Sequence, residues 1–115
     1  MALQSTHRVV GICPETAGGL PTPRPAAELR PDGRVVTADD VDVTDAYERG
    51  ASAAVALARA VGAERAILKA RSPSCGCAQV YDGTFTRTLR DGEGVTARAL
   101  REAGLAVTSE EDALP

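Results

Sequence analysis

The sequence predicts an α/β domain in which helices flank a small parallel, Rossmann-like sheet, with a β-hairpin as an excursion from it. Short runs rich in β-branched and aliphatic residues, at 7–13, 65–69 and 105–109, are typical of core strands. A stretch of helical periodicity separates the first two runs, and an Asp-Gly pair lies between apolar residues at 78–88. Because a strand–helix–strand crossover joins parallel neighbours, these elements favour a parallel sheet.

Length, composition and charge limit the classes of function that the protein can have. The 115 residues are expected to form one domain, 1–115, and the net charge of −3 offers no basic surface to nucleic acid or an anionic membrane. Only 3% of residues are aromatic, which leaves few rings for base stacking. No apolar run approaches the roughly 20 residues of a membrane span, and the first residues lack a signal-peptide pattern. A cytoplasmic protein is therefore expected, with no nucleic-acid and no membrane partner.

In the first part of the chain, two predicted strands are separated by a proline-rich segment. The strand at 7–13 is expected to end near Cys13. The stretch 14–33 holds five of the seven prolines, which lack a backbone donor and so nearly exclude a helix there. A short edge strand is expected over 34–37.

A long helix is expected next, over 45–61, with Thr44 as its N-cap residue and Gly62 as its stop. Small and apolar residues recur there at helical spacing: Tyr47, Gly50, Ala51, Ala54, Leu57, Ala58 and Val61. The stripe that they form is rich in alanine and permits close packing.

The second half is expected to complete the sheet. After the strand at 65–69 comes a hairpin over 78–88, with its turn at Asp82-Gly83. A last helix is expected from Val95 to Gly104, and the strand at 105–109 follows it.

Two of the three cysteines lie beyond predicted strand ends. Cys13 directly follows the first strand, and Cys75 follows the strand at 65–69. Because ligands of open parallel sheets bind outside the carboxyl ends of the strands, both thiols are expected at one site. A simple packing role is an equal alternative for Cys13. It is the weaker interpretation for Cys75, which lies in a turn rich in glycine, proline and serine.

Other polar residues near these thiols have structural alternatives. Ser72 and Ser74 can bond the backbone of their own turn. A nucleophile with a histidine base is not favoured, because the one histidine, His7, is remote in sequence. Glu15 can serve as general acid or base, but on these residues alone a solvated loop carboxylate is the simpler interpretation. The loop glycines, at 18–19 and at 92 and 94, match no phosphate-binding fingerprint.

Five segments in order resemble the motifs of the thiouracil desulfurase family: CPETAGGLPTPRPAAEL, DVTDAYERGA, AILKARSPSCGC, VYDGTF and GEGVTARALREAGLAV. The resemblance extends from Val9 to Glu110. It implies an iron–sulfur enzyme that converts a thiolated pyrimidine such as 2-thiouracil to uracil and sulfide without net redox. In the family, three cysteines hold a 4Fe–4S cluster, and an open iron binds the thiocarbonyl sulfur. An open coordination position is typical of a catalytic metal.

The resemblance also implies roles for individual residues. Cys13 and Cys75 would be cluster ligands, and Glu15 would be the acid or base that activates water. Ser74, or else Ser72, would hydrogen-bond the substrate or an intermediate. The implied partner is a small-molecule thiopyrimidine.

The chain departs from the family at its N-terminus. The resemblance implies a first strand, leading into a Cys-Leu-Leu-Gly stretch with the third ligand, which this sequence lacks. A truncated version is the favoured explanation, because loss of a central strand bares apolar surface on its neighbours. The other explanation is a genuine short form, either with Cys13, Cys75 and Cys77 as an altered metal site or with no cluster. Bared apolar surface predicts self-association, most simply as a homodimer.

Two other functions remain as alternatives. One is a non-catalytic module that binds a small heterocycle or anion without a cluster. The other is a thiol or zinc site at Cys75-Gly76-Cys77. It ranks last because two cysteines with no neighbouring histidine supply too few zinc ligands.

Overall fold

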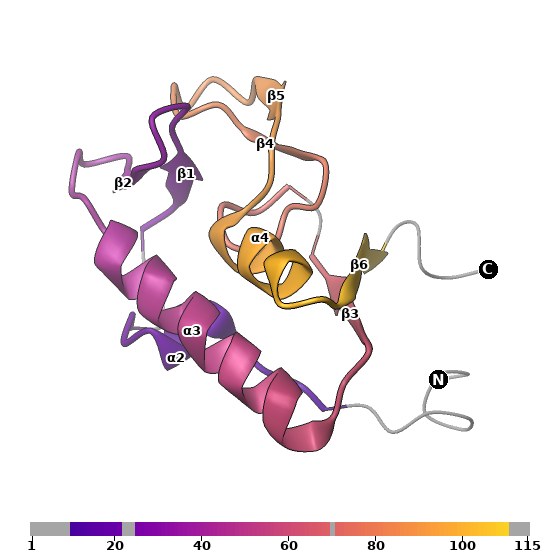
Figure 1. Ribbon diagram of the computed structural model, residues 1–115. Helices are drawn as coiled ribbons and strands as arrows, with labels where there is room; N and C mark the ends of the chain where they lie inside the picture. The colour runs from indigo at the N-terminus through magenta and orange to yellow at the C-terminus, as the bar shows by residue number, and fades with distance from the viewer. Residues whose placement is uncertain (1–9, 22–24, 70, 111–115) are drawn as a thin grey trace.

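The structure is a computed structural model that describes residues 10–21, 25–69 and 71–110 (Figure 1). Its helices and strands follow in this order: α2 (Pro14–Ala17), β1 (Ala27–Leu29), β2 (Val35–Thr37), α3 (Thr44–Val61), β3 (Arg65–Leu68), β4 (Gln79–Tyr81), β5 (Leu89–Asp91), α4 (Val95–Glu102) and β6 (Ala106–Ser109). The mixed α/β class is confirmed. No helix within the described ranges is long and apolar enough to cross a membrane.

A parallel pair is present between β3 and β6, whereas the strand–helix–strand pair expected from 7–13 and 65–69 is not formed by the described residues. The register of β3 and β6 runs from Arg65 opposite Ala106 to Leu68 opposite Ser109. A core of Ala54, Ala58 and Leu100 lies where α3 and α4 meet, and side chains of β3 and β6 pack against it. The two strands are less buried than the sequence predicts, and Ile67 is 39% exposed. Among the described residues this sheet has two strands, so each strand has one paired edge.

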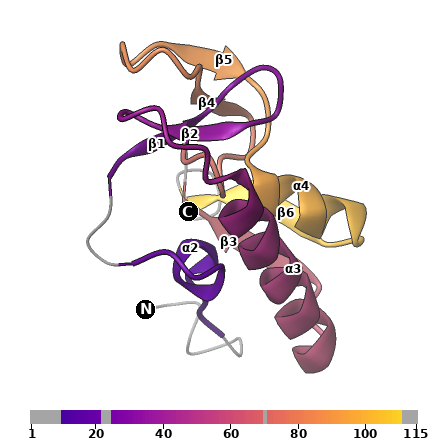
Figure 2. The same cartoon turned by 90° about the vertical axis from the view of Figure 1, so that its left-hand side faces the viewer.

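Two antiparallel hairpins form the other end of the molecule, as Figure 2 shows. One pairs β1 with β2, and the other pairs β4 with β5. Their shared core consists of Leu29, Val35, Tyr47 and Val80, so it joins both hairpins to the start of α3. The prediction of an edge strand at 34–37 is confirmed, and its partner β1 was not predicted.

The expected strand at 7–13 is not formed by its described residues. Residues 10–13 are irregular, and Val10 and Ile12 are 43% and 42% exposed. Residues 7–9, with His7, lie outside the described ranges. A strand needs a neighbour with which to share hydrogen bonds, and an apolar groove of about 750 Å³ separates this segment from β3.

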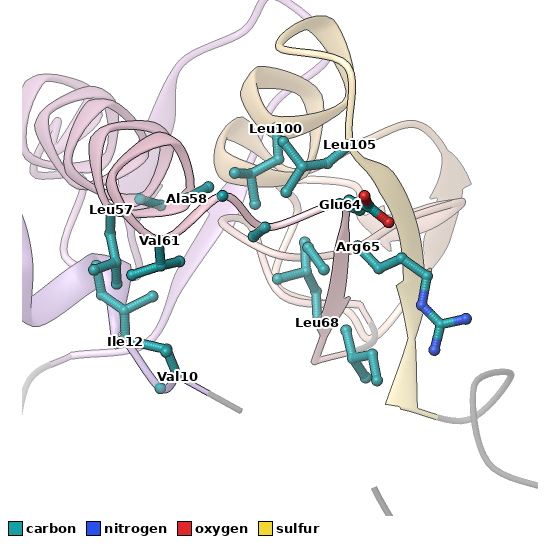
Figure 3. Close-up of a pocket in the computed structure, with 16 residues that line it drawn as sticks. Val10, Ile12, Leu57, Ala58, Val61, Glu64, Arg65, Leu68, Leu100 and Leu105 are labelled. Carbon is teal, nitrogen blue, oxygen red and sulfur yellow. The ribbon is translucent and has the colours of Figure 1, made fainter. Parts of the chain in front are cut away.

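Figure 3 shows this groove, with Val10, Ile12 and residues of α3 on one side and residues of β3 and α4 on the other. The resemblance implies an additional central strand in the sheet. No strand within the described ranges fills the groove, so that implication stays a prediction.

The near-exclusion of helix from 14–33 is wrong for its first four residues. Pro14 opens α2 at the first helical position, where a missing N–H is tolerated because that group has no intrahelical partner. The single turn closes with the Gly18 N–H donating to the Pro14 carbonyl at 2.9 Å.

The long helix is confirmed, but Thr44 is not its N-cap residue. Val43 holds that position, and no side chain caps the first turn. The Thr44 hydroxyl instead accepts the Val35 N–H at 2.9 Å and donates to Asp42 at 2.6 Å, so it fastens α3 to β2. Most of the predicted stripe is buried, whereas Leu57 and Val61 are half-buried and line the groove, and Gly62 ends the helix in a left-handed conformation with φ of 68°.

The hairpin at 78–88 is confirmed with a longer loop than expected. Tyr81 pairs with Leu89, so residues 82–88 connect the strands. The Asp82 carboxylate accepts the Thr84 N–H at 3.0 Å. The buried Glu28 carboxylate accepts the N–H groups of Gly83 and Phe85, which ties the loop to β1. The last helix begins at Val95 as predicted and ends at Glu102, shortly before Gly104.

Candidate functional site

The Ser72–Cys77 loop, which follows β3, is docked on the first turn of α4. The Val95 N–H donates to the Pro73 carbonyl at 2.9 Å. The Ser74 carbonyl accepts from Thr96 and Ala97 at 2.7 and 3.1 Å. These are helix N–H groups that have no intrahelical partner, and no side chain caps α4. The loop therefore caps the helix, and the helix fixes the loop that carries Cys75.

Gly94 makes this docking possible. A Cβ at this position would lie 2.5 Å from the Ser74 carbonyl oxygen and 2.7 Å from the Cys75 nitrogen, closer than real Cβ atoms approach. The Gly94 N–H also donates to the Gly76 carbonyl at 2.7 Å. The close approach that Gly94 permits is thus made by the Ser72–Cys77 loop, in agreement with the lack of a phosphate-binding fingerprint around this glycine.

Polar groups lie around the Cys75 sulfur, whose thiol donates to the Ser74 hydroxyl at 3.6 Å. Cys75 is 9% exposed, and burial raises the pKa of its thiol because the charged form loses solvation. The Ser74 and Ser72 hydroxyls and the Lys69 backbone N–H act on the same pKa in the opposite direction. Such donors stabilise a thiolate, which is the form in which cysteine binds metals. Burial is the largest of these effects, so the pKa of the Cys75 thiol stays above its usual value, and the polar groups offset that rise in part.

The two serines of the loop differ in their contacts. The Ser72 hydroxyl accepts the Cys75 N–H at 2.7 Å, which confirms the predicted turn within the loop, and Ser72 is half-buried. Ser74 is completely buried. Its hydroxyl lies 2.8 Å from the Thr96 hydroxyl and 3.6 Å from the Cys75 sulfur.

Cys13 and Glu15 are placed by α2. Cys13 is the N-cap residue and is exposed, and the Thr16 hydroxyl donates to its sulfur at 3.4 Å. Glu15 lies in the first turn and is half-buried. Its carboxylate adds to the rise in the pKa of Cys75, so it lies within electrostatic range of that thiol. Glu15 and Cys75 are thus electrostatic neighbours although they lie far apart in the sequence, and the convergence of the Cys13 and Cys75 sulfurs stays a prediction.

Two glycines hold α2 against α3, the contact visible in Figures 1 and 2. A Cβ at Gly50 would overlap the Pro14 carbonyl oxygen, and a Cβ at Gly18 would overlap the Ala46 carbonyl oxygen. The Arg49 guanidinium donates to the Gly18 carbonyl at 3.2 Å. The position of Cys13 and Glu15 therefore depends on direct backbone contact between the two helices.

Cys77 is half-buried, and its sulfur lies 3.6 Å from the Cys75 carbonyl oxygen. Within the described ranges, no three His, Cys, Asp or Glu side chains lie close enough together to hold one metal ion. Neither the groove of Figure 3 nor a cleft of about 650 Å³ between α3 and α4 is lined by a cysteine.

Sequence reasoning missed Lys69, Thr96 and the two helix-contact glycines. Lys69 acts through its backbone, which no side-chain pattern reveals. Thr96 lies in the first turn of a helix, where threonine is common on the surface, so its complete burial has no local signal. Gly50 is one of the small residues of the helix stripe, which is the sequence feature that indicates a close contact.

The chain is similar to known proteins over most of its length. The family model described as 2-thiouracil desulfurase matches residues 1–112. The uncharacterized protein YbbK of Bacillus subtilis (strain 168) is 41% identical over 119 residues, covering 96% of this chain and 79% of that protein. The solved structure of the 4Fe–4S-dependent thiouracil desulfidase TudS is 46% identical, with a TM-score of 0.91, and the match covers 97% of this chain and 74% of that one. The chain thus belongs to the 2-thiouracil desulfurase family.

Proposed function

We propose that this protein removes sulfur from a thiolated pyrimidine such as 2-thiouracil, with a 4Fe–4S cluster as its cofactor. The oxygen of a water molecule bonds to the ring carbon, the carbon–sulfur bond breaks, and sulfur leaves as sulfide. Carbon keeps its oxidation state, so the reaction needs no oxidant or reductant. Family membership supports the reaction class, and the name of the TudS structure supports the cofactor.

The observation that carries the proposal is the polar contact of the buried Cys75, whose sulfur lies 3.6 Å from the Ser74 hydroxyl and whose N–H donates to the Ser72 hydroxyl at 2.7 Å. Burial without compensation disfavours a thiolate, and here two hydroxyls and one backbone N–H oppose that effect. Thiolates are the usual ligands of iron–sulfur clusters, and hydrogen bonds to their sulfurs tune the iron. These surroundings therefore fit a cluster ligand better than a packing cysteine, which needs no such donors.

Cys13 is the second ligand in this proposal, and Cys77 is the remaining thiol that the chain offers. When bound, the cluster supplies an iron that acts as a Lewis acid toward the thiocarbonyl sulfur. The protein's own contribution is to hold the thiolates on two rigid supports, α2 and the α4-docked loop. It also keeps the Glu15 carboxylate near them.

We assign Glu15 to the water and Ser72 to the substrate. Glu15 takes a proton from the attacking water. This role requires a base that lies close to the thiolates. Ser72 is only half-buried, so its hydroxyl can reach a pyrimidine atom. Ser74 acts on Cys75 instead, because its hydroxyl is completely buried and already contacts Thr96.

Glu15→Gln should lower kcat by about 100-fold, the size typical of losing a general base. The amide keeps the shape of the side chain but cannot take the proton. The cluster absorbance should remain unchanged, because Glu15 is not a ligand in this proposal. Steady-state assays beside a visible spectrum check both expectations, and wild-type kcat in the variant would remove Glu15 from the mechanism.

The direct test of the function is anaerobic reconstitution with iron and sulfide, followed by incubation with 2-thiouracil. We expect a broad brown absorbance and the release of uracil and sulfide in equal amounts. Activity should disappear when the cluster is removed by a chelator or by oxygen. Binding of 2-thiouracil that is indifferent to chelator, without turnover, would instead favour the non-catalytic module.

A further inference from the structure

We propose that Thr96 is a positioning residue for this reaction and that it acts through Ser74 on the sulfur of Cys75. In this inference, which rests on the proposed function, the Thr96 hydroxyl orients the Ser74 hydroxyl so that it donates to the metal-bound sulfur. Thr96 does not touch the substrate. Its effect would be on the reactivity of the iron that Cys75 would hold.

The positions of the two hydroxyls support this role. Thr96 and Ser74 are both 0% exposed, and their oxygens lie 2.8 Å apart. The Ser74 oxygen in turn lies 3.6 Å from the Cys75 sulfur and accepts from its thiol, a bond that metal binding would reverse. The three groups therefore form a chain that starts in the first turn of α4 and ends at the proposed ligand.

Metal binding fixes the direction of this chain. A metal-bound thiolate has no hydrogen to donate, so the Ser74 hydroxyl must donate to it. Ser74 has one hydroxyl hydrogen, and once this points to sulfur, the oxygen is free to accept from Thr96. Each bond in such a chain polarises the next, so Thr96 strengthens the Ser74 donation to sulfur.

Donation to a ligand sulfur has a defined consequence for the metal. It draws electron density from the thiolate and so from the iron, which raises the reduction potential of a cluster. An iron with less electron density is also the stronger Lewis acid toward a thiocarbonyl sulfur. Thr96 is thus expected to raise both the potential of the cluster and the rate of desulfuration.

The Thr96 hydroxyl is not needed to cap α4 or to fill the space around residue 96. The loop is already held to α4 by backbone bonds, including those from the N–H groups of Thr96 and Ala97 to the Ser74 carbonyl. Valine has nearly the shape of threonine and would fill the same buried space. The two hydroxyls are the part of this contact that backbone bonding and packing leave unexplained.

The test compares Thr96→Val with Thr96→Ser in the reconstituted protein. Thr96→Val removes the hydroxyl, whereas Thr96→Ser keeps it and so serves as the matched control. We expect the valine variant to show a more negative cluster potential, a shifted thiolate-to-iron absorption band and about 10-fold weaker retention of iron, as is typical when a hydrogen-bond partner of a metal ligand is lost. The serine variant should resemble wild type in all three. Thermal unfolding of the metal-free proteins measures any general loss of stability separately.

The outcomes separate this inference from the function on which it rests. A brown wild-type protein whose valine variant has the same potential and spectrum would overturn the role of Thr96, even if that variant melts at a lower temperature. Equal shifts in the valine and serine variants would overturn it as well. A wild-type protein that takes up no iron would overturn the proposed cofactor first, and the role of Thr96 with it.

Discussion

Cys75→Ala should abolish cluster binding and reduce desulfuration to background. Losing a residue that merely hydrogen-bonds a metal ligand typically reduces metal affinity or activity by about 10–100-fold, so losing the ligand itself should exceed 100-fold. The effect should come from the missing sulfur and not from unfolding. The loop remains fastened to α4 through the carbonyls of Pro73, Ser74 and Gly76, which the substitution leaves intact. Iron content, visible absorbance and sulfide release measure the result.

Two further variants sharpen this prediction. Cys75→Ser conserves the shape of the side chain and should lose iron as completely as the alanine variant. Cys77→Ser decides the assignment of the remaining thiol. Retained absorbance would make Cys77 a bystander, whereas loss would make it a ligand beside Cys13 and Cys75. A Cys75→Ala protein that keeps wild-type iron and activity would contradict the proposed site.

Gly50→Ala should destabilise the protein and separate the two halves of its site. The added methyl group overlaps the Pro14 carbonyl oxygen, and backbone atoms cannot move aside as a flexible side chain can. Overpacking of this kind costs about 3 kcal/mol at its larger end, which corresponds to a melting temperature lowered by about 10 °C. Since α2 carries Cys13 and Glu15, activity should fall as well.

The direction of the change in stability is informative, because helix propensity alone predicts that Gly50→Ala stabilises the protein. Alanine in place of glycine within a helix is normally stabilising by about 1 kcal/mol. Ser52→Ala, at an exposed position of the same helix, is the matched control and should leave the melting temperature unchanged or slightly higher. Gly11→Ala, where an added Cβ meets nothing within 4 Å, should be tolerated. A Gly50→Ala protein as stable as these controls would contradict the close contact between α2 and α3.

Local patterns in the sequence predicted those elements that are determined by interactions between residues close in sequence. The stripe of α3 follows from helical spacing, and the stop at Gly62 follows from a conformation that glycine adopts freely. The bond from the Cys75 N–H to the Ser72 hydroxyl spans three residues and belongs to a common turn. The parallel sheet class followed from the crossover rule, although the pair that forms is β3 with β6, connected through α4, and not the expected pair at 7–13 and 65–69.

Other features depend on contacts between distant segments, and the sequence does not reveal these. Thr44 has a residue type that suits an N-cap, but its hydroxyl is engaged by Val35 of another element. Val10 and Ile12 have the composition of a strand, but they have no strand beside them among the described residues. The contact between Ser74 and Thr96 joins residues 22 positions apart, and each of them is common on protein surfaces.

The most direct measurement is a crystal structure of the anaerobically reconstituted protein, with diffraction recorded at the iron absorption edge. We expect anomalous iron density within bonding distance of the sulfurs of both Cys13 and Cys75, with the Glu15 carboxylate facing it. Iron bound to only one of these sulfurs, or the two sulfurs directed to separate faces of the domain, would contradict the account.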